Sequence, residues 1–228
     1  MHMELYHVLN RGVERRTIFV DDRDRARFVH DLYEFNDTAP TINNNRLSMI
    51  DLGGLSLGAS SPERADSRTR LVDIHGWCIM GNHYHLLLSE RMDGGLSKFL
   101  MKLNVGYAKY FNERYTRSGY VFQGRTKRIQ IKRDAHFLHI LHYIHLNPLD
   151  FRHDTSQWRS KEIANSKTAL KHLNEYRWSS YLDYCGTPNF PSVLTRDLFG
   201  GVFKDYPRTL RAFLQDMELQ SLAKITLE

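Results

Sequence analysis

Two pairs of polar side chains have the types and spacings that could break a phosphodiester bond. His83 and His85 are separated by one residue in the stretch GNHYHLLL. Because side chains alternate faces along a strand, the two imidazoles would share one face and could hold one divalent cation. Tyr143 and Asn147 lie four residues apart in DAHFLHILHYIHLN, so a helix would place them one above the other. If that helix packs over the histidine face, the four side chains form a candidate active site.

The chemistry of such a site would be coherent. An unperturbed tyrosine has a pKa of about 10 and is a weak nucleophile at neutral pH. A cation held by His83, His85 and the Asn147 carbonyl would polarise a phosphate and stabilise the developing charge while Tyr143 attacks in line. Mg²⁺ or Mn²⁺ suits this chemistry, although the ligand types leave zinc open. The product, a phosphotyrosine, would conserve the phosphodiester energy and permit strands to be rejoined.

Each residue also has a simpler interpretation. The chain contains twelve histidines, so two of them separated by one residue arise readily by coincidence. Asn147 precedes Pro148, and asparagine before proline commonly ends a helix. Tyr143 alone is typical of core or interface packing. The candidate site therefore depends on a fold that brings the helix and the strand together.

The order of predicted elements supplies such a fold. Apolar periodicity and turn residues predict strands at 5–10, 71–80, 82–90 and 120–131, the last interrupted at Gly124, and helices at 21–36, 97–114 and 134–147. Asp134 is expected to cap the last helix. This βαββαβ order with an added helix indicates an α+β fold, a ferredoxin-like or RRM-like antiparallel sheet with helices on one face and the other face free for ligands. The added helix could cross the sheet beside the histidines.

Two further regions lie outside this pattern. Residues 39–69 are rich in Asn, Gly, Ser and Pro with little periodicity, which indicates a flexible insertion, with a short ordered piece expected near residues 47–52. Residues 149–228 are expected to form a mainly helical C-terminal extension, with helices at 162–173 and 208–222. Residues 1–148 would then be the catalytic domain.

Basic residues are concentrated in one part of the chain. The net charge is +6, but residues 98–133 contain ten Lys or Arg against the single acid Glu113. A polyanion such as nucleic acid is the natural partner for such a band, and a solvated basic face is the alternative. Three lysines project opposite the apolar face of the 97–114 helix and are expected to steer a DNA backbone: Lys98, Lys102 and Lys109.

The composition indicates a cytoplasmic globular protein. Apolar residues make up 41% of the chain and aromatic residues 12%. We find no apolar run of eighteen residues and no charged segment followed by an apolar one at the start, so no membrane span or secretory signal is expected. Cys78 and Cys185 belong to no CxxC pair, which argues against a zinc ribbon or disulfide framework. We expect both to be free thiols.

Several motifs resemble those of one protein family. YHVLNRG, HGWCIMGNHYHLLL, GYAKYFNERYTRSGYVFQGRTKRI, YIHLNP and YRWSSY occur in order and cover residues 5–39 and 71–186. Together they resemble the REP-associated tyrosine transposases of the HUH single-strand transposase superfamily. The resemblance implies that His83 and His85 are the metal pair, Tyr143 the nucleophile and Asn147 the third metal ligand. It also implies action on single-stranded DNA, often near hairpins, with a 5′-phosphotyrosine link and a free 3′-OH.

The resemblance adds further site residues and shows two departures. Arg125, Lys127 and Arg128 match the family's FQGR-x-K segment and are expected to contact DNA, with Tyr120 or Phe122 stacking on bases unless these rings are core. The insertion lengthens a connection that is normally short. The nucleophile helix carries additional histidines, of which His136 would lie near Tyr143 or in solvent. For His75, a structural role competes with one behind the metal ligands.

Three functions follow as hypotheses. The first is a metal-dependent DNA endonuclease and strand transferase that uses Tyr143 covalently, in its own subunit or in a homodimer. The second is a domesticated nucleic-acid-binding module on the same fold, without efficient cleavage. The third is a histidine-rich metal hydrolase that attacks small phosphoesters with water. The basic band disfavours the third, and only a covalent adduct separates the first from the second.

Overall fold

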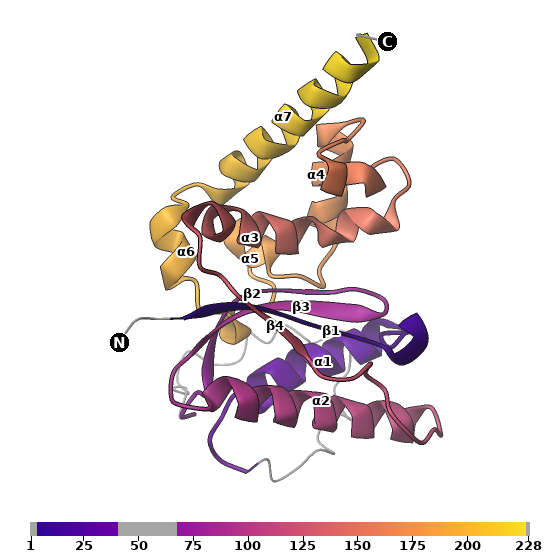
Figure 1. Cartoon of the computed structure of the whole chain (residues 1–228), viewed down its shortest axis with the longest axis vertical. Helices are drawn as coiled ribbons and strands as arrows, with labels where there is room; N and C mark the ends of the chain where they lie inside the picture. Colours follow the sequence, from indigo (N-terminus) through magenta and orange to yellow (C-terminus); the bar gives the residue numbers. More distant parts are fainter. Residues whose placement is uncertain (1–3, 41–67, 227–228) are drawn as a thin grey trace.

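A four-stranded antiparallel sheet forms the centre of the molecule. The computed structural model describes residues 4–40 and 68–226, so the predicted insertion, including the piece at 47–52, lies almost wholly outside the described residues. The strands are arranged in the order β2-β3-β1-β4 (Figure 1), with bounds β1 Leu5–Arg11, β2 Val72–Ile79, β3 His83–Glu90 and β4 Lys127–Gln130. All three pairings are antiparallel. The α+β prediction is confirmed.

Two long helices cover one face of the sheet, as expected. Strand positions on that face, such as Val8, Tyr84 and Leu86, are fully buried. They pack against α1 (Asp22–Glu34) and α2 (Gly95–Arg114). Asp21 caps the start of α1, because its carboxylate accepts hydrogen bonds from the backbone of Arg23 and Asp24. This half of the molecule is a single apolar core.

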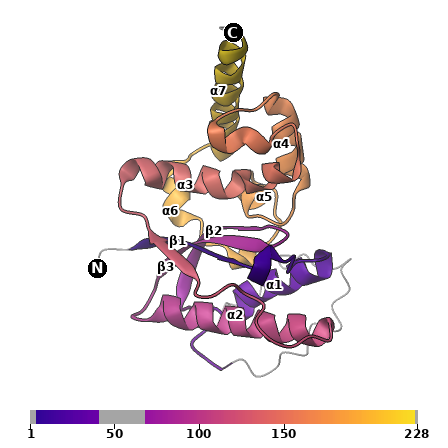
Figure 2. The same cartoon turned by 45° about the vertical axis from the view of Figure 1, so that its right-hand side comes forward.

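The other face is not left free, which corrects that part of the prediction. Helix α3 (Asp134–Leu146) crosses it, so that the sheet lies between α3 and the α1–α2 layer (Figures 1 and 2). Leu87 of β3 and Leu141 and Ile144 of α3 are fully buried in a second core. Gly76 of β2 allows this close approach, since a β-carbon there would lie 2.9 Å from the Leu141 Cδ1 atom. Access to this face is therefore restricted.

Most predicted elements shift by a few residues at their ends, and β4 and the start of α3 differ for identifiable reasons. The strand expected at 120–131 is reduced to β4, because Gly124 adopts a positive φ of 68° that breaks the extended chain. Residue Phe122 makes only an isolated bridge to Gly12. Asp134 is the first residue of α3 rather than its cap, and the capping residue Arg133 makes no side-chain hydrogen bond there.

The C-terminal region is mainly helical, as predicted, and packs directly on α3. Its helices are α4 (Ser166–Glu175), α5 (Tyr181–Tyr184), α6 (Asp197–Val202) and α7 (Tyr206–Thr226). Short 3-10 turns complete the chain: η1 Val13–Arg15, η4 Asn147–Phe151, η5 Ser156–Ser160 and η6 Pro191–Val193. Trp158, Leu173 and Leu210 share the second core with α3. The expected boundary at 148 therefore falls inside a continuous apolar core.

Buried histidines join α3 to this region. His142 and His145 both contact the Tyr206 hydroxyl, at 3.2 and 2.7 Å from their Nδ1 atoms. The other ring nitrogen of His145 lies 2.8 Å from the Ser180 hydroxyl, which also accepts a hydrogen bond from the backbone of Trp77 in β2. These contacts fix the rotation of α3 about its axis. They therefore fix the direction in which Tyr143 points.

We expect this network to make stability depend on pH. Burial, with a smaller effect from the charge of His139, lowers the pKa of His142 to about 4. Between the unfolded value of about 6.5 and the folded value, only the unfolded chain binds the proton, so the free energy of unfolding falls as pH falls through that window. Urea titration measures how far the free energy of unfolding falls between about pH 7.5 and about pH 4.5. This fall should be about 2–3 kcal/mol smaller in His142→Gln than in the unaltered protein. Equal differences would contradict a neutral, buried His142.

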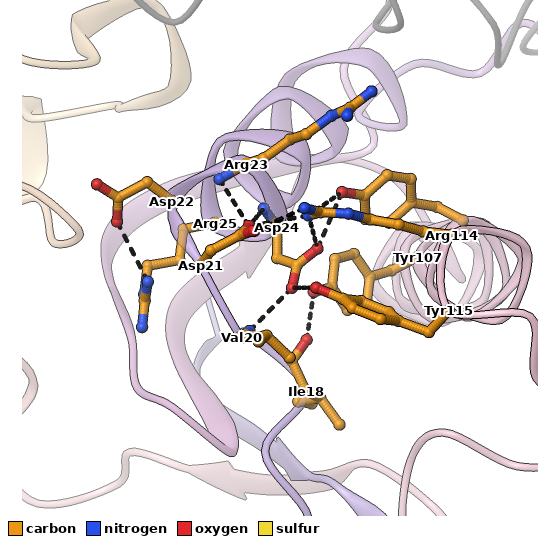
Figure 3. A network of polar contacts seen from close by, with 11 residues as sticks. Ile18, Val20, Asp21, Asp22, Arg23, Asp24, Arg25, Tyr107, Arg114 and Tyr115 are labelled. Atoms are coloured by element: carbon orange, nitrogen blue, oxygen red, sulfur yellow. Dashed lines mark hydrogen bonds and ion pairs between the residues drawn. The ribbon is translucent and has the colours of Figure 1, made fainter.

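A charged network links the start of α1 to the end of α2 (Figure 3). The fully buried Asp24 carboxylate accepts hydrogen bonds from the Val20 backbone and from the hydroxyls of Tyr110 and Tyr115, at 2.8 to 2.9 Å. It also pairs with Arg114, whose second terminal nitrogen lies 2.6 Å from Asp21. Asp24 is thus the shared acceptor of one backbone N–H, two tyrosine hydroxyls and Arg114.

Asp24→Ala is therefore expected to be strongly destabilising. Without the Asp24 carboxylate, the Val20 backbone and the hydroxyls of Tyr110 and Tyr115 lose their buried acceptor, although Arg114 keeps its pair with Asp21. The free energy of unfolding should therefore fall by about 3 kcal/mol. Urea titration monitored by circular dichroism measures the change. The matched control is Asp154→Ala, which breaks an exposed pair with Arg152 at 2.9 Å and should move the unfolding midpoint far less. Similar shifts for the two variants would show that the Asp24 network adds nothing beyond a surface ion pair.

Candidate active site

The structure brings His83, His85 and Tyr143 together on the face that α3 crosses. The ring centroids of His83 and His85 lie 4.9 Å apart, and those of His85 and Tyr143 lie 5.8 Å apart. The strand register explains the shared face, since Arg11 and Leu9 of β1 pair with His83 and His85 respectively. Tyr143 is half-buried, and the plane of its ring is nearly perpendicular to that of His85, at 86°. The phenol and the imidazoles thus meet in one place.

A third imidazole, which the sequence did not identify, completes this cluster. The Nε2 atom of His7 in β1 lies 2.9 Å from the Nδ1 atom of His85, with the rings stacked at 5.1 Å between centroids. The His7 ring also meets that of Tyr143 at 5.6 Å. In the pairing of β1 with β3, His7 lies opposite Leu87, which is two residues from His85. His7 and His85 therefore share one face of the sheet. Its position depends on the register between β1 and β3, which the sequence does not reveal.

Burial keeps these imidazoles neutral at neutral pH. It lowers the pKa of His7 to about 4, helped by the charge of His136. Burial is also the main cause of the low pKa of His83, about 4, and the charges of Arg11 and Arg159 lower it further. The pKa of His85 is lowered well below its usual value, again chiefly by burial. Neutral imidazole is the form that binds a metal ion.

The hydrogen bonds of His83 and His85 leave a nitrogen of each available as a ligand. The Asn82 amide donates to the Arg15 carbonyl, so its oxygen accepts from His83 Nδ1 at 2.6 Å and the Nε2 atom of His83 keeps its lone pair. In the tautomer where His85 Nδ1 donates to His7, the Nε2 atom of His85 also keeps its lone pair. That nitrogen is buried without a hydrogen-bond partner among the described residues. A divalent cation would satisfy it, so the two imidazoles fit a metal ion.

Asn147, the expected third ligand, is engaged elsewhere in this conformation. Its amide nitrogen donates to the backbone carbonyls of Tyr143 and Ile144, at 2.7 and 3.3 Å. Its oxygen accepts a hydrogen bond of 2.7 Å from Arg159 in η5. Within the described part of the chain, no three His, Cys, Asp or Glu side chains form a metal-binding group. A cation on the two imidazoles would therefore need an amide oxygen, water or a substrate oxygen to complete its coordination.

Arg159 and its neighbours come from the C-terminal region. The guanidinium pairs with Asp150 and lies 4.4 Å from the centroid of the Trp158 ring. Trp158 in turn contacts the Tyr143 ring at 5.5 Å and donates to Asp150 at 2.7 Å. Burial lowers the pKa of Arg159, but the hydrogen bond and charge of Asp150 outweigh it and the net pKa is raised. Arg159 lies in a segment without clear periodicity, and no sequence signal identified it.

The six expected DNA contacts are divided between the two sides of the sheet. Lys127 pairs with Leu9 and so shares the face of His85, whereas Arg128 pairs with Val8, on the α2 side, and donates to Ser97 at 2.8 Å. Arg125 is exposed just before β4. Helix α2, with Lys98, Lys102 and the exposed Lys109, lies on the side of the sheet opposite α3 (Figure 2).

Two of the α2 lysines have structural partners. Lys98 donates to the Thr38 carbonyl at 3.1 Å, and Lys102 donates to the carbonyls of Asp37 and Ala39 at 2.6 and 2.8 Å. They hold the chain that leaves α1. The structure therefore does not bring them to Tyr143, and a role in steering DNA would have to act at long range.

The remaining candidate residues differ in whether their side chains are exposed or buried. Tyr120 is 88% exposed and free to stack on a base, whereas Phe122 belongs to the core beneath α2. His75 is buried and bonded to Ser89 at 2.8 Å and to the Thr195 carbonyl at 3.2 Å, which is a structural role. His136 is exposed, and its charge is felt at His7. Cys78 and Cys185 are free thiols, as expected.

Comparison with known proteins yields likenesses in structure, with six matching chains among the solved structures. The chain has a similar fold to the solved structure of a REP-associated tyrosine transposase bound to a REP hairpin, with a TM-score of 0.46 and 12% sequence identity. The alignment covers 86% of this chain and 87% of that chain. No family model matches the sequence, and the search of curated proteins gives no match. Among the described helices, none has the length and apolar character to cross a membrane. At this identity the likeness concerns the fold alone.

Proposed function

We propose that this protein is a metal-dependent single-stranded DNA endonuclease and strand transferase with Tyr143 as its nucleophile. One observation carries the proposal: the Tyr143 ring lies 5.8 Å from His85, whose Nε2 atom is buried without a partner among the described residues. A phenol ring from α3 and an imidazole from β3 that has one nitrogen unpartnered within the described part of the chain thus lie in contact. The motifs that resemble the REP-associated tyrosine transposases support the same assignment, residue by residue.

The roles of the residues follow from their positions. His83 and His85 would hold Mg²⁺ or Mn²⁺, which supplies charge stabilisation to the reacting phosphate when bound. The Tyr143 oxygen would form a bond to phosphorus while the bond to the 3′ oxygen breaks, the phenol proton passing to solvent and the 3′ oxygen taking one up. Lys127, on the same face as His85, and the exposed Arg125 would contact the DNA backbone.

The test is the formation of a covalent protein–DNA adduct. Purified protein is incubated with end-labelled single-stranded hairpin oligonucleotides and Mn²⁺, and the products are separated on a denaturing gel. We expect a labelled band at the mass of the protein plus the 5′-phosphorylated fragment, and its loss when EDTA removes the cation. Mass spectrometry of the digested band should locate the nucleotide on Tyr143.

Other results would favour the alternative functions. If a wide set of hairpins binds with a steep salt dependence but gives no adduct, the protein is a binding module on this fold. If cleavage proceeds without an adduct and water supplies the attacking oxygen, Tyr143 is not the nucleophile. An adduct on a different tyrosine would contradict the assignment directly.

A further inference from the structure

Arg159 occupies an unusual position for a residue beside a metal site. Its guanidinium donates to the Asn147 oxygen at 2.7 Å and lies 5.9 Å from the centroid of the Tyr143 ring. The guanidinium also pairs with the Asp150 carboxylate and lies 4.4 Å from the centroid of the Trp158 ring. The side chain is nevertheless 39% exposed, so an anion arriving from solvent could reach it. Arg159 is both fixed in place and accessible.

The orientation of the Asn147 amide is determined by its surroundings. Its nitrogen donates to the Tyr143 and Ile144 carbonyls, which could not accept a bond from the amide oxygen. The oxygen must therefore face Arg159. Asn147 is fully buried, so no solvent competes for that oxygen. The one atom of Asn147 that could bind a cation is thus covered by a positive charge.

We propose that Arg159 keeps Asn147 out of the metal site until a phosphate of bound DNA takes over the guanidinium. The inference rests on the proposed function and adds a coupling between its two ligands. Guanidinium binds phosphate through two parallel hydrogen bonds, which would replace its bonds to Asn147 and Asp150. Moving Arg159 toward the phosphate frees the Asn147 oxygen. DNA would then raise the affinity for the cation, and the cation would raise the affinity for DNA by the same factor.

The test measures Mn²⁺ affinity in the absence of DNA, by electron paramagnetic resonance of the free ion. Arg159→Met removes both the charge and the hydrogen bond and should bind Mn²⁺ about tenfold more tightly than the unaltered protein. Arg159→Lys keeps the charge and should gain much less. Arg152→Met is the matched control, because Arg152 forms only an exposed pair with Asp154 in the same region. We expect no change in that variant.

A double-mutant cycle with Asn147→Ala identifies the atom involved. In the unaltered background Asn147 is already covered, so Asn147→Ala should change Mn²⁺ affinity by less than about twofold. In the Arg159→Met background it should cancel the tenfold gain. Loss of the Asn147 bonds to α3 is common to both backgrounds and cancels in the cycle, and thermal unfolding verifies that each variant is folded. If Asn147→Ala does not fold, the comparison of Arg159→Met with Arg159→Lys decides.

Several results would overturn the proposal. Arg159→Met binding Mn²⁺ no more tightly than the unaltered protein would do so, as would an equal effect of Asn147→Ala in both backgrounds or no Mn²⁺ binding by any variant. These measurements contain no DNA and no cleavage step. If the cycle behaves as expected but no covalent adduct ever forms, the proposed function fails while the role of Arg159 stands. If the covalent adduct forms but the effects of Arg159→Met and Asn147→Ala on Mn²⁺ affinity are additive, the proposed function stands and the role of Arg159 fails.

Discussion

Tyr143→Phe is expected to abolish the covalent adduct and to reduce cleavage by at least about 10⁴-fold. The phenylalanine ring keeps the contacts with His7, His85 and Trp158 but has no oxygen to attack phosphorus. Removal of a nucleophile eliminates the whole reaction path that depends on it. Quantitative gel assays under single-turnover conditions measure the rate, and fluorescence anisotropy measures DNA affinity. We expect the affinity to change by less than about twofold, because no backbone contact is lost.

The matched control for this variant is Tyr33→Phe. Tyr33 lies on α1, on the other side of the sheet, and its ring contacts the Arg68 guanidinium at 3.4 Å. The substitution removes a phenol oxygen without removing the ring, and activity should be unchanged. A Tyr143→Phe protein that still forms the adduct would show that another residue attacks. Loss of activity in both variants would point to a general effect on folding.

His85→Ala is expected to produce the second largest effect, a loss of cation-dependent cleavage by about 10³-fold or more. The substitution removes the buried nitrogen that has no hydrogen-bond partner within the described residues and leaves His83 as the only imidazole ligand. Mn²⁺ affinity, measured by electron paramagnetic resonance, should fall in parallel. The salt dependence of DNA binding should be unchanged, because it depends on the basic residues.

A substitution at His7 separates the effect of losing the His85 ligand from the effect of losing the contact that orients it. His7→Phe keeps a ring stacked near His85 but removes the 2.9 Å contact that orients the imidazole. Removal of such a supporting partner typically lowers metal affinity by about 10- to 100-fold. His7→Phe should therefore lie between the unaltered protein and His85→Ala, with partial recovery of cleavage at high Mn²⁺. If His85→Ala keeps full activity at low Mn²⁺, the metal assignment is wrong.

The elements of the fold could be predicted because their signals are local. The alternation in LYHVLN predicts β1, and the Asp21 cap followed by periodic apolar residues predicts α1. The strand at 120–131 was predicted too long, since a pattern of strand-forming residues does not reveal the positive φ of Gly124. The C-terminal region could be predicted as helical, but not its packing on the second sheet face, which depends on contacts between distant segments.

The residues of the candidate site divide in the same way, into those with a local signal in the sequence and those that depend on contacts between distant segments. His83, His85, Tyr143 and Asn147 carry their spacing within single elements, so the sequence could suggest them. His7 reaches His85 only through the pairing of β1 with β3, and Arg159 reaches Asn147 only through the packing of η5. The α2 lysines show a further limit of the sequence. Their helical spacing could be predicted, but the carbonyl groups that two of them bind could not.

The shared core of α3 and the C-terminal region limits how this protein can be divided or altered. Trp158, Leu173 and Leu210 belong to the same buried core as α3, and Arg159 reaches Asn147 from the same region. A fragment that ends at residue 148 would expose that apolar surface and release the tyrosine helix from its orientation. The C-terminal region is thus part of the folded unit that holds Tyr143, and substitutions far along the chain can shift that tyrosine without contacting it.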